Sequence, residues 1–543
     1  MALGPIKKVV LGSLAFAVFW ILAVFPAVPF LPIGRTAGSI LGAMLMVIFK
    51  VITPKEAYSA INLPVLGLLF GTMVVSIYLE RADMFKHLRV LLSWKSWGAK
   101  DMLCRICIVS AISSALFTND TTCVILTEFI LKIARENNIR PEPFLLGLAS
   151  SSNIGSSATP IGNPQNLIIA IQSGISFGEF VLGLLPAVLL GVFVNALILL
   201  CMFWRLLSDV EKDSDVHQIS LATMSSPKSL ESHECDPITE HVTSQSSPVI
   251  NRDGGHSKNL KNRLSELDMC SDSCGEIELK KPVLSKKEAT DNTLSEIGEQ
   301  KEERFARGGV QGTMEMTTDL ESGPQQSTEE SKGQLNRWKR LSWKLCIYLG
   351  TVGMLVAFLM GLDMSWTALT AALIFVILDF KDAGPCLEKV NQQVSYSLLV
   401  FFCGMFITVD GFSKTGIPTS FWTLMEPHAQ IDHASGIAVL AIVILVLSNV
   451  VSNVPTVLLL GAKVAACAAA ISPSKEKKAW LILAWVSTVA GNLSLLGSAA
   501  NIIVCEQAFR AQPSYNITFW SHLKFGVPST LIVTTIGLAL VLA

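Results

Sequence analysis

The chain has 543 residues, of which 51% are hydrophobic and only 16% are charged, and its formal net charge is −1. Its apolar runs are too long for a soluble core, so the composition excludes a soluble protein and predicts a multi-pass protein in a lipid bilayer. The 12 Cys residues are scattered and form no double CxxC pattern, which argues against disulfides or a metal site. We also expect no cofactor.

The first predicted domain covers residues 1–205 and begins with an apolar run preceded by Lys7 and Lys8. This run superficially resembles a signal peptide, but it is too long and lacks a small-residue cleavage pattern, so we expect a retained span. An amphipathic stretch, Arg81 to Lys100, separates the third and fourth predicted segments. The apolar segments of this half lie at about residues 9–31, 36–53, 63–80, 103–134, 142–172 and 176–204.

Residues 206–340 differ abruptly in composition, being rich in Ser, Glu, Lys, Asp, Gln and Gly and poor in aromatic residues. Such a segment buries too little apolar area to offset the entropy of ordering, so we predict a disordered linker. The linker divides the membrane part into two halves, the second of which covers residues 341–543.

The second half repeats the order of the first, so the fold class is predicted to be all-α with two copies of one unit. The segments near 103–134 and 435–469 are long enough for re-entrant hairpins, which leaves about five full crossings in each half. Five is odd, so the two copies would be inverted, and the excess of Lys and Arg favours a cytoplasmic linker. The apolar segments of this half lie at about residues 342–361, 365–380, 395–412, 435–469, 479–507 and 521–543.

Two polar interruptions occur in each half, at equivalent places about 335 residues apart. Polar, Gly- and Pro-containing breaks at matched positions are typical of secondary transporters, whose broken helices meet at a midplane substrate site. The matched pairs are Asn119 with Asn453, Thr122 with Thr456, Thr159 with Ser494, Gly162 with Gly497 and Asn166 with Asn501.

Amide and hydroxyl side chains at these breaks both donate and accept hydrogen bonds, which suits a small solute bearing several OH groups. The alternative is that they serve only packing and hydrogen bonding between membrane helices. We expect no catalytic residues. The candidate substrate-binding residues are Thr118, Asn119, Thr122, Asn153, Ser157, Thr159, Asn163, Asn166, Ser452, Asn453, Thr456, Asn492, Ser494 and Asn501.

Asp120 is an ionisable residue inside a predicted span, which by default indicates a function such as proton coupling. Its partner in the second half is Val454, so the coupling site would be asymmetric. The alternative role is a cap for the second arm of the hairpin.

Basic residues are missing from the two broken segments: no Arg or Lys lies between Leu145 and Arg205 or between Leu481 and Glu506. A carboxylate site would be expected to use fixed cations or many oriented amides, so a neutral polyhydroxyl solute fits better. The chain also lacks HExxH, a nucleophile elbow and GxxxxGK[ST], which argues against an enzyme.

The motifs Phe117-Thr-Asn-Asp120, Val451-Ser-Asn-Val-Pro-Thr456 and Gly491-Asn-Leu-Ser-Leu-Leu-Gly497 resemble those of arsenite-pump membrane subunits in the ion-transporter superfamily. The whole chain, including Phe30 to Ser39 and Phe70 to Phe85, more closely resembles plant low-silicon efflux transporters. This resemblance implies active export of silicic acid across the plasma membrane in exchange for protons. It also implies some transport of arsenous or germanic acid, which are small uncharged hydroxides as well.

A wider similarity to sodium-coupled dicarboxylate carriers implies that Thr118, Asn119, Ser452 and Asn453 are hairpin-tip residues. The chain departs from the Ser-Asn-Thr tip of those carriers, because Asp120 follows Asn119. The main hypothesis is therefore proton-coupled silicic acid export, and the nearest rival is a sodium-coupled anion carrier. A channel ranks below both. No nucleic-acid partner is expected, and a homo-oligomer is left open.

Overall fold

The computed structural model describes residues 4–24, 34–93, 98–136, 139–224, 326–379, 394–515 and 517–543. Within these ranges the regular structure is entirely helical, as the composition predicts. Seven of the described helices are long and apolar enough to cross a membrane, which makes the chain a multi-pass membrane protein. The seven spans are Ile6–Ala23, Leu63–Arg81, Phe177–Ser208, Arg337–Leu359, Tyr396–Ser413, Ala434–Val451 and Phe519–Leu542.

The first half begins and ends with spans and carries the two predicted breaks between them. Its last helix is kinked at Phe203, where the backbone leaves helical geometry. The helices are α1 (Ile6–Val24), α2 (Arg35–Ile48), α3 (Pro54–Ala60), α4 (Leu63–Arg81), α5 (Met84–Ser93), α6 (Ala99–Leu116), α7 (Asn119–Glu136), α8 (Glu142–Ser156), η1 (Pro160–Gly162), α9 (Pro164–Ser173) and α10 (Phe177–Met224).

The second half has the same succession of long, broken and terminal helices. Its helices are α11 (Gln326–Leu359), α12 (Met364–Asp379), α14 (Tyr396–Ser413), α15 (Ile417–Met425), η2 (Glu426–His428), α16 (Ala434–Val451), α17 (Asn453–Ala469), α18 (Pro473–Val489), η3 (Ala490–Asn492), η4 (Leu495–Gly497), α19 (Ala499–Ala511), η5 (Pro513–Tyr515) and α20 (Phe519–Leu542).

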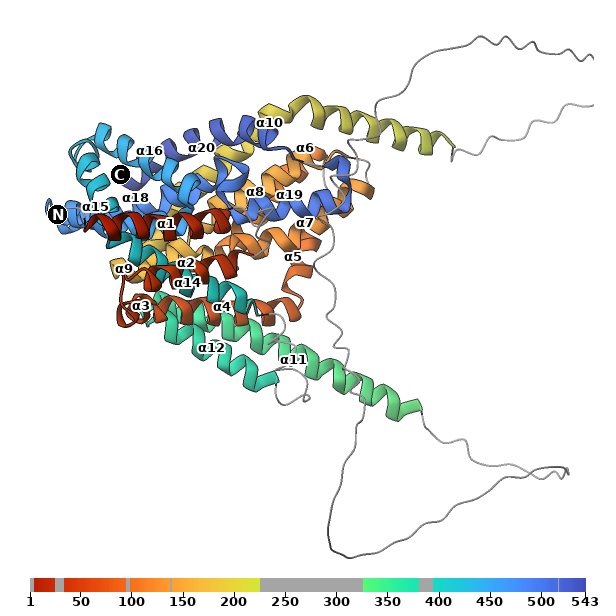
Figure 1. Ribbon diagram of the computed structural model, residues 1–543. Coiled ribbons are helices and arrows are strands. Elements are labelled where there is room, and N and C mark those ends of the chain that lie inside the picture. Colours follow the sequence, from red (N-terminus) through yellow and green to blue (C-terminus); the bar gives the residue numbers. More distant parts are fainter. Residues whose placement is uncertain are drawn as a thin grey trace, which may run out of the picture. The chain divides into compact units, whose positions relative to one another are not determined.

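The edges of the predicted linker are helical, because α10 continues to Met224 and α11 begins at Gln326. Residues 225–325 of that prediction lie outside the described residues. Figure 1 shows the N and C termini at one end of the helices, whereas the ends of α10 and α11 that lead into the linker lie at the other.

The two halves pack into each other reciprocally. Helix α2 of the first half packs on α14 of the second, and its counterpart α12 packs on α4. At each crossing a glycine allows the backbones to approach closely: a Cβ on Gly71 would lie 2.7 Å from the carbonyl carbon of Ala368, and one on Gly404 would lie 2.5 Å from that of Ser39. The close approach therefore has the same cause in both halves.

The helical breaks position the site. Helices α6 and α7 are separated at Phe117 and Thr118 and pack against each other, and α16 and α17, separated at Ser452, do the same. In the segment that is broken between α8 and α9, the two arms pack on different neighbours: α8 packs on α6 and α10, whereas α9 packs on α17 and α18. Pro164 and Pro455 lie in the first turns of α9 and α17, where the missing N–H costs no helical bond.

Candidate functional site

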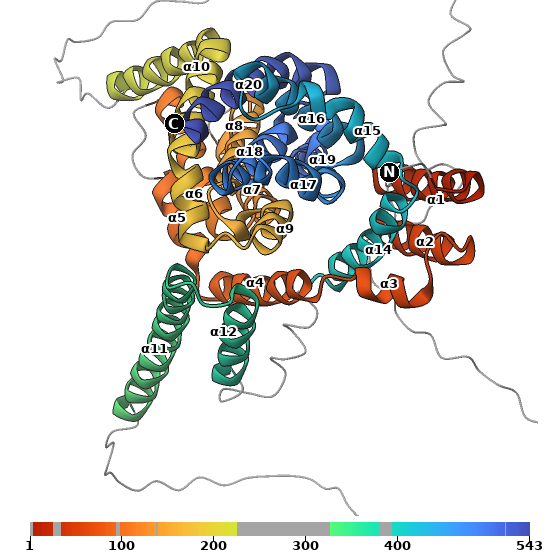
Figure 2. The same cartoon turned by 90° about the vertical axis from the view of Figure 1, so that its left-hand side faces the viewer.

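A cavity of about 360 Å³ lies where the first turns of six helices meet, namely those of α2, α7, α9, α14, α17 and α19. One wall is formed by α1, α2 and α14, and the other by α7, α9, α17 and α19 together with the turns before them. Figure 2 shows α1, α2 and α14 beside the group that contains the other four helices. The cavity is therefore bounded by segments from both halves of the chain.

The tips of the two broken hairpins have strained backbones at matched positions. Thr118 has φ = 126° and Ser452 has φ = 79°, a region that residues other than glycine seldom adopt. Asn119 and Asn453 follow as the first residues of α7 and α17, and both line the cavity. Such strain persists where the surrounding structure imposes it, and it is concentrated at ligand and active sites.

Asn153 of α8 is the centre of a buried polar network. Its Oδ1 accepts from Nδ2 of Asn119 at 2.9 Å and from Oγ of Ser498 at 2.9 Å. Its Nδ2 donates to Oδ1 of Asn492 at 2.8 Å and to Oδ1 of Asn501 at 3.1 Å. Because all four partners come from elsewhere in the two halves, this one side chain fixes the breaks relative to one another.

Asn166 and Asn501 make equivalent contacts in their two halves. Nδ2 of Asn166 donates to the carbonyl of Ser156 at 3.1 Å, and Nδ2 of Asn501 donates to the carbonyl of Gly491 at 2.8 Å. The hydroxyl of Thr488 in turn donates to Oδ1 of Asn166 at 3.0 Å, which joins the second half to the first. These amides hold the non-helical backbone that a membrane protein must satisfy internally.

Three polar atoms at the hairpin tips are buried and accept or donate no hydrogen bond within the described part of the chain: Oδ1 of Asp120, Oγ1 of Thr122 and Oδ1 of Asn453. Buried polar groups are normally satisfied, so the unpaired atoms of Asp120 and Asn453, two residues that line the cavity, are available to a solute or an ion. The capping role considered for Asp120 falls to Thr118, whose Oγ1 accepts from the N–H of Thr121 at 3.3 Å. The Asp120 carboxylate instead lines the cavity.

The sequence-predicted residues thus occupy two layers. Asn119, Asp120, Asn163, Ser452 and Asn453 line the cavity. Asn153, Asn166, Asn492, Ser494 and Asn501 lie behind them in the hydrogen-bond network. Four of the remaining candidates bond to the main chain or to a neighbour: Ser157 to Ile154, Thr159 to Ala115, Thr456 to Ser452 and Thr118 to Thr121. The hydroxyl of Thr122 has no partner among the described residues.

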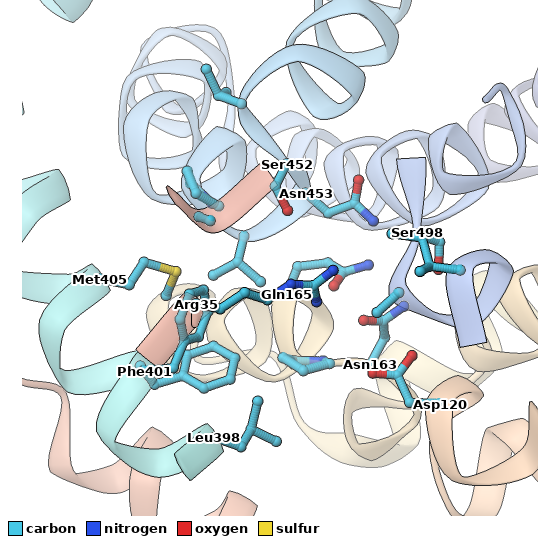
Figure 3. A pocket seen from close by; sticks show the side chains of 18 of the residues that line it. Arg35, Asp120, Asn163, Gln165, Leu398, Phe401, Met405, Ser452, Asn453 and Ser498 are labelled. Atoms are coloured by element: carbon cyan, nitrogen blue, oxygen red, sulfur yellow. The ribbon is translucent and has the colours of Figure 1, made fainter. Parts of the chain in front are cut away.

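Arg35 is the residue that the sequence analysis missed most clearly. It is the first residue of α2, is half-buried and lines the cavity on the wall opposite Asp120. In Figure 3, Arg35 and Phe401 lie together on one side of the cavity, and Asp120 lies on the opposite side. The cavity therefore does hold a fixed cation, contrary to the expectation drawn from the two broken segments. The signal available in the sequence was an arginine directly before the apolar segment predicted at about residues 36–53.

Several uncharged polar residues of the cavity were also missed. Gln165 lines it and donates from Nε2 to the hydroxyl of Thr488 at 3.2 Å. Ser498 lines it and bonds to Asn153. Thr36, Ser395 and Ser397 contribute hydroxyls from the α2 and α14 side. Apart from Arg35 and Asp120, all the polar side chains that line the cavity are amides, hydroxyls or the Trp20 indole.

Comparison with known proteins is consistent with this arrangement. The family model described as "Citrate transporter" matches residues 17–490. The rice protein named silicon efflux transporter LSI3 is 50% identical over 100% of this chain and 99% of its own length. A putative transporter, arsB, of Dictyostelium discoideum is 32% identical over 94% of this chain and 88% of its own. These relatives are transporters, as the resemblance in the sequence implies. Because the family model covers most of its length, the chain belongs to the citrate transporter family.

Proposed function

We propose that this protein is a secondary transporter that exports silicic acid across the plasma membrane in exchange for protons. The observation that carries the proposal is the lining of the cavity: amides and hydroxyls surround a carboxylate oxygen, Oδ1 of Asp120, that has no hydrogen-bond partner among the described residues. Groups that both donate and accept match a small hydroxylated molecule. The full-length similarity to the rice silicon efflux transporter supports the same substrate class, with arsenous and germanic acid as further candidates.

The architecture proposed for this function is a pair of inverted repeats, each with about five crossings and one re-entrant hairpin. The matched order of elements and the reciprocal packing of α2 on α14 and α12 on α4 support it. In this arrangement the linker is cytoplasmic. The four breaks meet near the midplane, where irregular backbone is tolerated because it lines a cavity.

Substrate contact is assigned to the cavity-lining layer: Asn119, Asn163, Ser452 and Asn453, joined by Gln165 and Ser498. The network around Asn153 and Asn166 holds these residues in place rather than touching the solute. Asp120 carries the proton. An intramembrane carboxylate with a free oxygen is suited to gain and lose a proton during a transport cycle.

A sodium-coupled anion carrier is the second candidate, and two observations favour it. Arg35 places a cation in the cavity, and guanidinium groups pair well with carboxylates. The matched family model is also described as a citrate transporter. Against it stands the charge of Asp120, which together with Arg35 makes the ionisable lining of the cavity neutral rather than positive.

Uphill transport into or out of proteoliposomes distinguishes the two candidates. Vesicles containing the purified full chain are loaded with silicic acid and exposed to a proton gradient or a sodium gradient in turn. The proposal expects concentrative movement of silicic acid with the proton gradient, without sodium and without competition by citrate. Sodium-dependent movement that citrate blocks would select the anion carrier, and flux that never runs uphill would select a channel.

A further inference from the structure

Among the described residues that line the cavity, two are ionisable, and they lie on opposite walls. Arg35 begins α2, a helix that packs on α1, α3 and α14, whereas Asp120 lies in the first turn of α7, which packs on α5, α6, α8 and α19. The two side chains face the same cavity but form no direct ion pair among the described residues. Arg35 makes no hydrogen bond within the described part of the chain, so its charge is not committed elsewhere.

The other described charged groups around α7 are not placed to act as a counter-charge to Asp120 across the cavity. The described ionisable residues on the helices packed against α7 do not line the cavity: Lys86 and His87 of α5, Lys100, Asp101, Cys104, Arg105 and Cys107 of α6, Glu142 of α8, and Cys505, Glu506 and Arg510 of α19. On α7 itself Cys123 lies within electrostatic reach of Asp120 but is a buried thiol that also contacts the hydroxyl of Ser152. Glu128, Lys132, Arg135 and Glu136 follow further along α7 and do not line the cavity.

We infer that Arg35 is the counter-charge of Asp120 and competes with the transported proton for the Asp120 carboxylate. Arg35 thereby sets the proton concentration at which this carboxylate becomes protonated. When the carboxylate is ionised, the guanidinium across the cavity stabilises the negative charge. When a proton binds the carboxylate, that attraction is lost and the cavity carries one net positive charge. Arg35 thus acts as a positioning residue through Asp120 and does not touch the proton.

The inference rests on the proposed function only in assigning the proton to Asp120; the identity of the solute does not enter. A cation facing a carboxylate across a cavity favours the ionised form, and its removal makes the carboxylate bind a proton more readily. In the neutral variant Arg35→Gln, the Asp120 carboxylate should therefore become protonated at a higher pH than in the native chain. The conservative variant Arg35→Lys keeps the charge and should behave like the native chain.

The test is an infrared titration of the purified full-length protein in lipid, without any transported solute. The carboxyl band that disappears in Asp120→Asn reports the protonation of Asp120. In Arg35→Gln the midpoint of this band is expected to move up by about one pH unit, equivalent to a tenfold change in proton concentration, and Arg35→Lys should stay near the native midpoint. Arg135→Gln is the matched control, because Arg135 is exposed on the same helix as Asp120 and lies outside the cavity lining.

The outcomes separate this inference from the proposed substrate. An unchanged midpoint in Arg35→Gln, an equal shift in Arg135→Gln, or the absence of any Asp120-dependent band would overturn the inference. If Arg35 instead binds an anionic solute, both Arg35 variants will raise the KM for that solute and leave the midpoint in place, which also overturns it. A shifted midpoint in a protein that does not export silicic acid would support the inference while contradicting the proposed function.

Discussion

Asn153 and Asn501, which lie 348 positions apart in the chain, are joined by a hydrogen bond of 3.1 Å between Nδ2 of the first and Oδ1 of the second. Thr488 and Asn166 make the reciprocal connection between the halves at 3.0 Å. Both hydrogen bonds join a residue of the first half to a residue of the second. The polar breaks are held together by their own side chains, which keeps the cavity between them in shape.

Asn153→Ala should destabilise the protein strongly. The substitution removes four hydrogen bonds and leaves buried polar atoms of Asn119, Asn492 and Asn501 with fewer partners. We expect the free energy of unfolding to fall by about 3 kcal/mol, because each orphaned buried group costs about 1–3 kcal/mol. Thermal unfolding of the purified protein in detergent measures this. An unchanged transition would show that the network does not hold the breaks together.

Asn453→Ala should reduce transport while leaving the stability of the protein nearly unchanged. Oδ1 of Asn453 is buried without a partner among the described residues, and the side chain lines the cavity. Its removal should therefore change the free energy of unfolding by less than about 1 kcal/mol, while export at low solute concentration falls about tenfold. Parallel transport and unfolding measurements on Asn453→Ala and Asn153→Ala check the contrast. Full transport by Asn453→Ala would remove this residue from the substrate layer.

The order of elements could be predicted because long apolar runs and matched polar breaks are properties of the sequence itself. The segment predicted at about 63–80 corresponds to Leu63–Arg81, and both hairpin breaks occur beside Asn119 and Asn453. The first predicted span reaches about residue 31, and residues 25–33 lie outside the described ranges, whereas the segment predicted at about 176–204 continues as α10 to Met224. Polarity locates a break well, whereas helix ends depend on local geometry that composition does not contain.

The division of the predicted site into two layers could not be obtained from the sequence. Asn119 and Asn153 look alike as polar residues in apolar segments, yet only Asn119 lines the cavity. Arg35 was missed because it lies in a part of the chain without a polar motif and reaches the cavity through the packing of α2 on α14. Contacts between residues so distant in sequence arise from tertiary packing, which no local pattern records.

Gly404→Ala should weaken the packing between the halves. A Cβ at this position would lie 2.5 Å from the carbonyl carbon of Ser39, and backbone cannot move aside as a flexible side chain does. Overpacking of this kind typically costs about 1–3 kcal/mol, so the unfolding temperature should fall. Gly353→Ala is the matched control, because no atom lies within 4 Å of its added Cβ. Equal unfolding temperatures for the two variants would contradict the close packing of α14 on α2.

Asp83 should not contribute to the pH dependence of transport. Hydrogen bonds from the ammonium groups of Lys344 and Lys86 lower the pKa of its carboxyl to about 2. A lowered carboxyl pKa contributes stability that is complete above the unfolded pKa of about 3.9 and is lost only as the pH falls through about 2. Asp83→Asn should therefore weaken the link from α4 to α11 equally at all neutral and mildly acidic pH values.

The transport measurement for this variant is the pH profile of export. Asp83→Asn should leave the midpoint of that profile at the native value, because Asp83 stays ionised throughout the range in which Asp120 is proposed to work. Asparagine also tolerates the positive φ of 66° at this position, so the substitution removes the charge without adding backbone strain. A displaced midpoint would mean that the ion pair at this end of α4 takes part in proton coupling.

Proton movement driven by silicic acid tests directly whether the two fluxes are coupled through Asp120. Proteoliposomes containing a pH-sensitive dye receive an outward or inward gradient of silicic acid at equal internal and external pH. Protons should move opposite to silicic acid through the native protein, and this movement should be lost in Asp120→Asn. Silicic acid flux without any proton movement, or proton movement that persists in Asp120→Asn, would contradict this coupling.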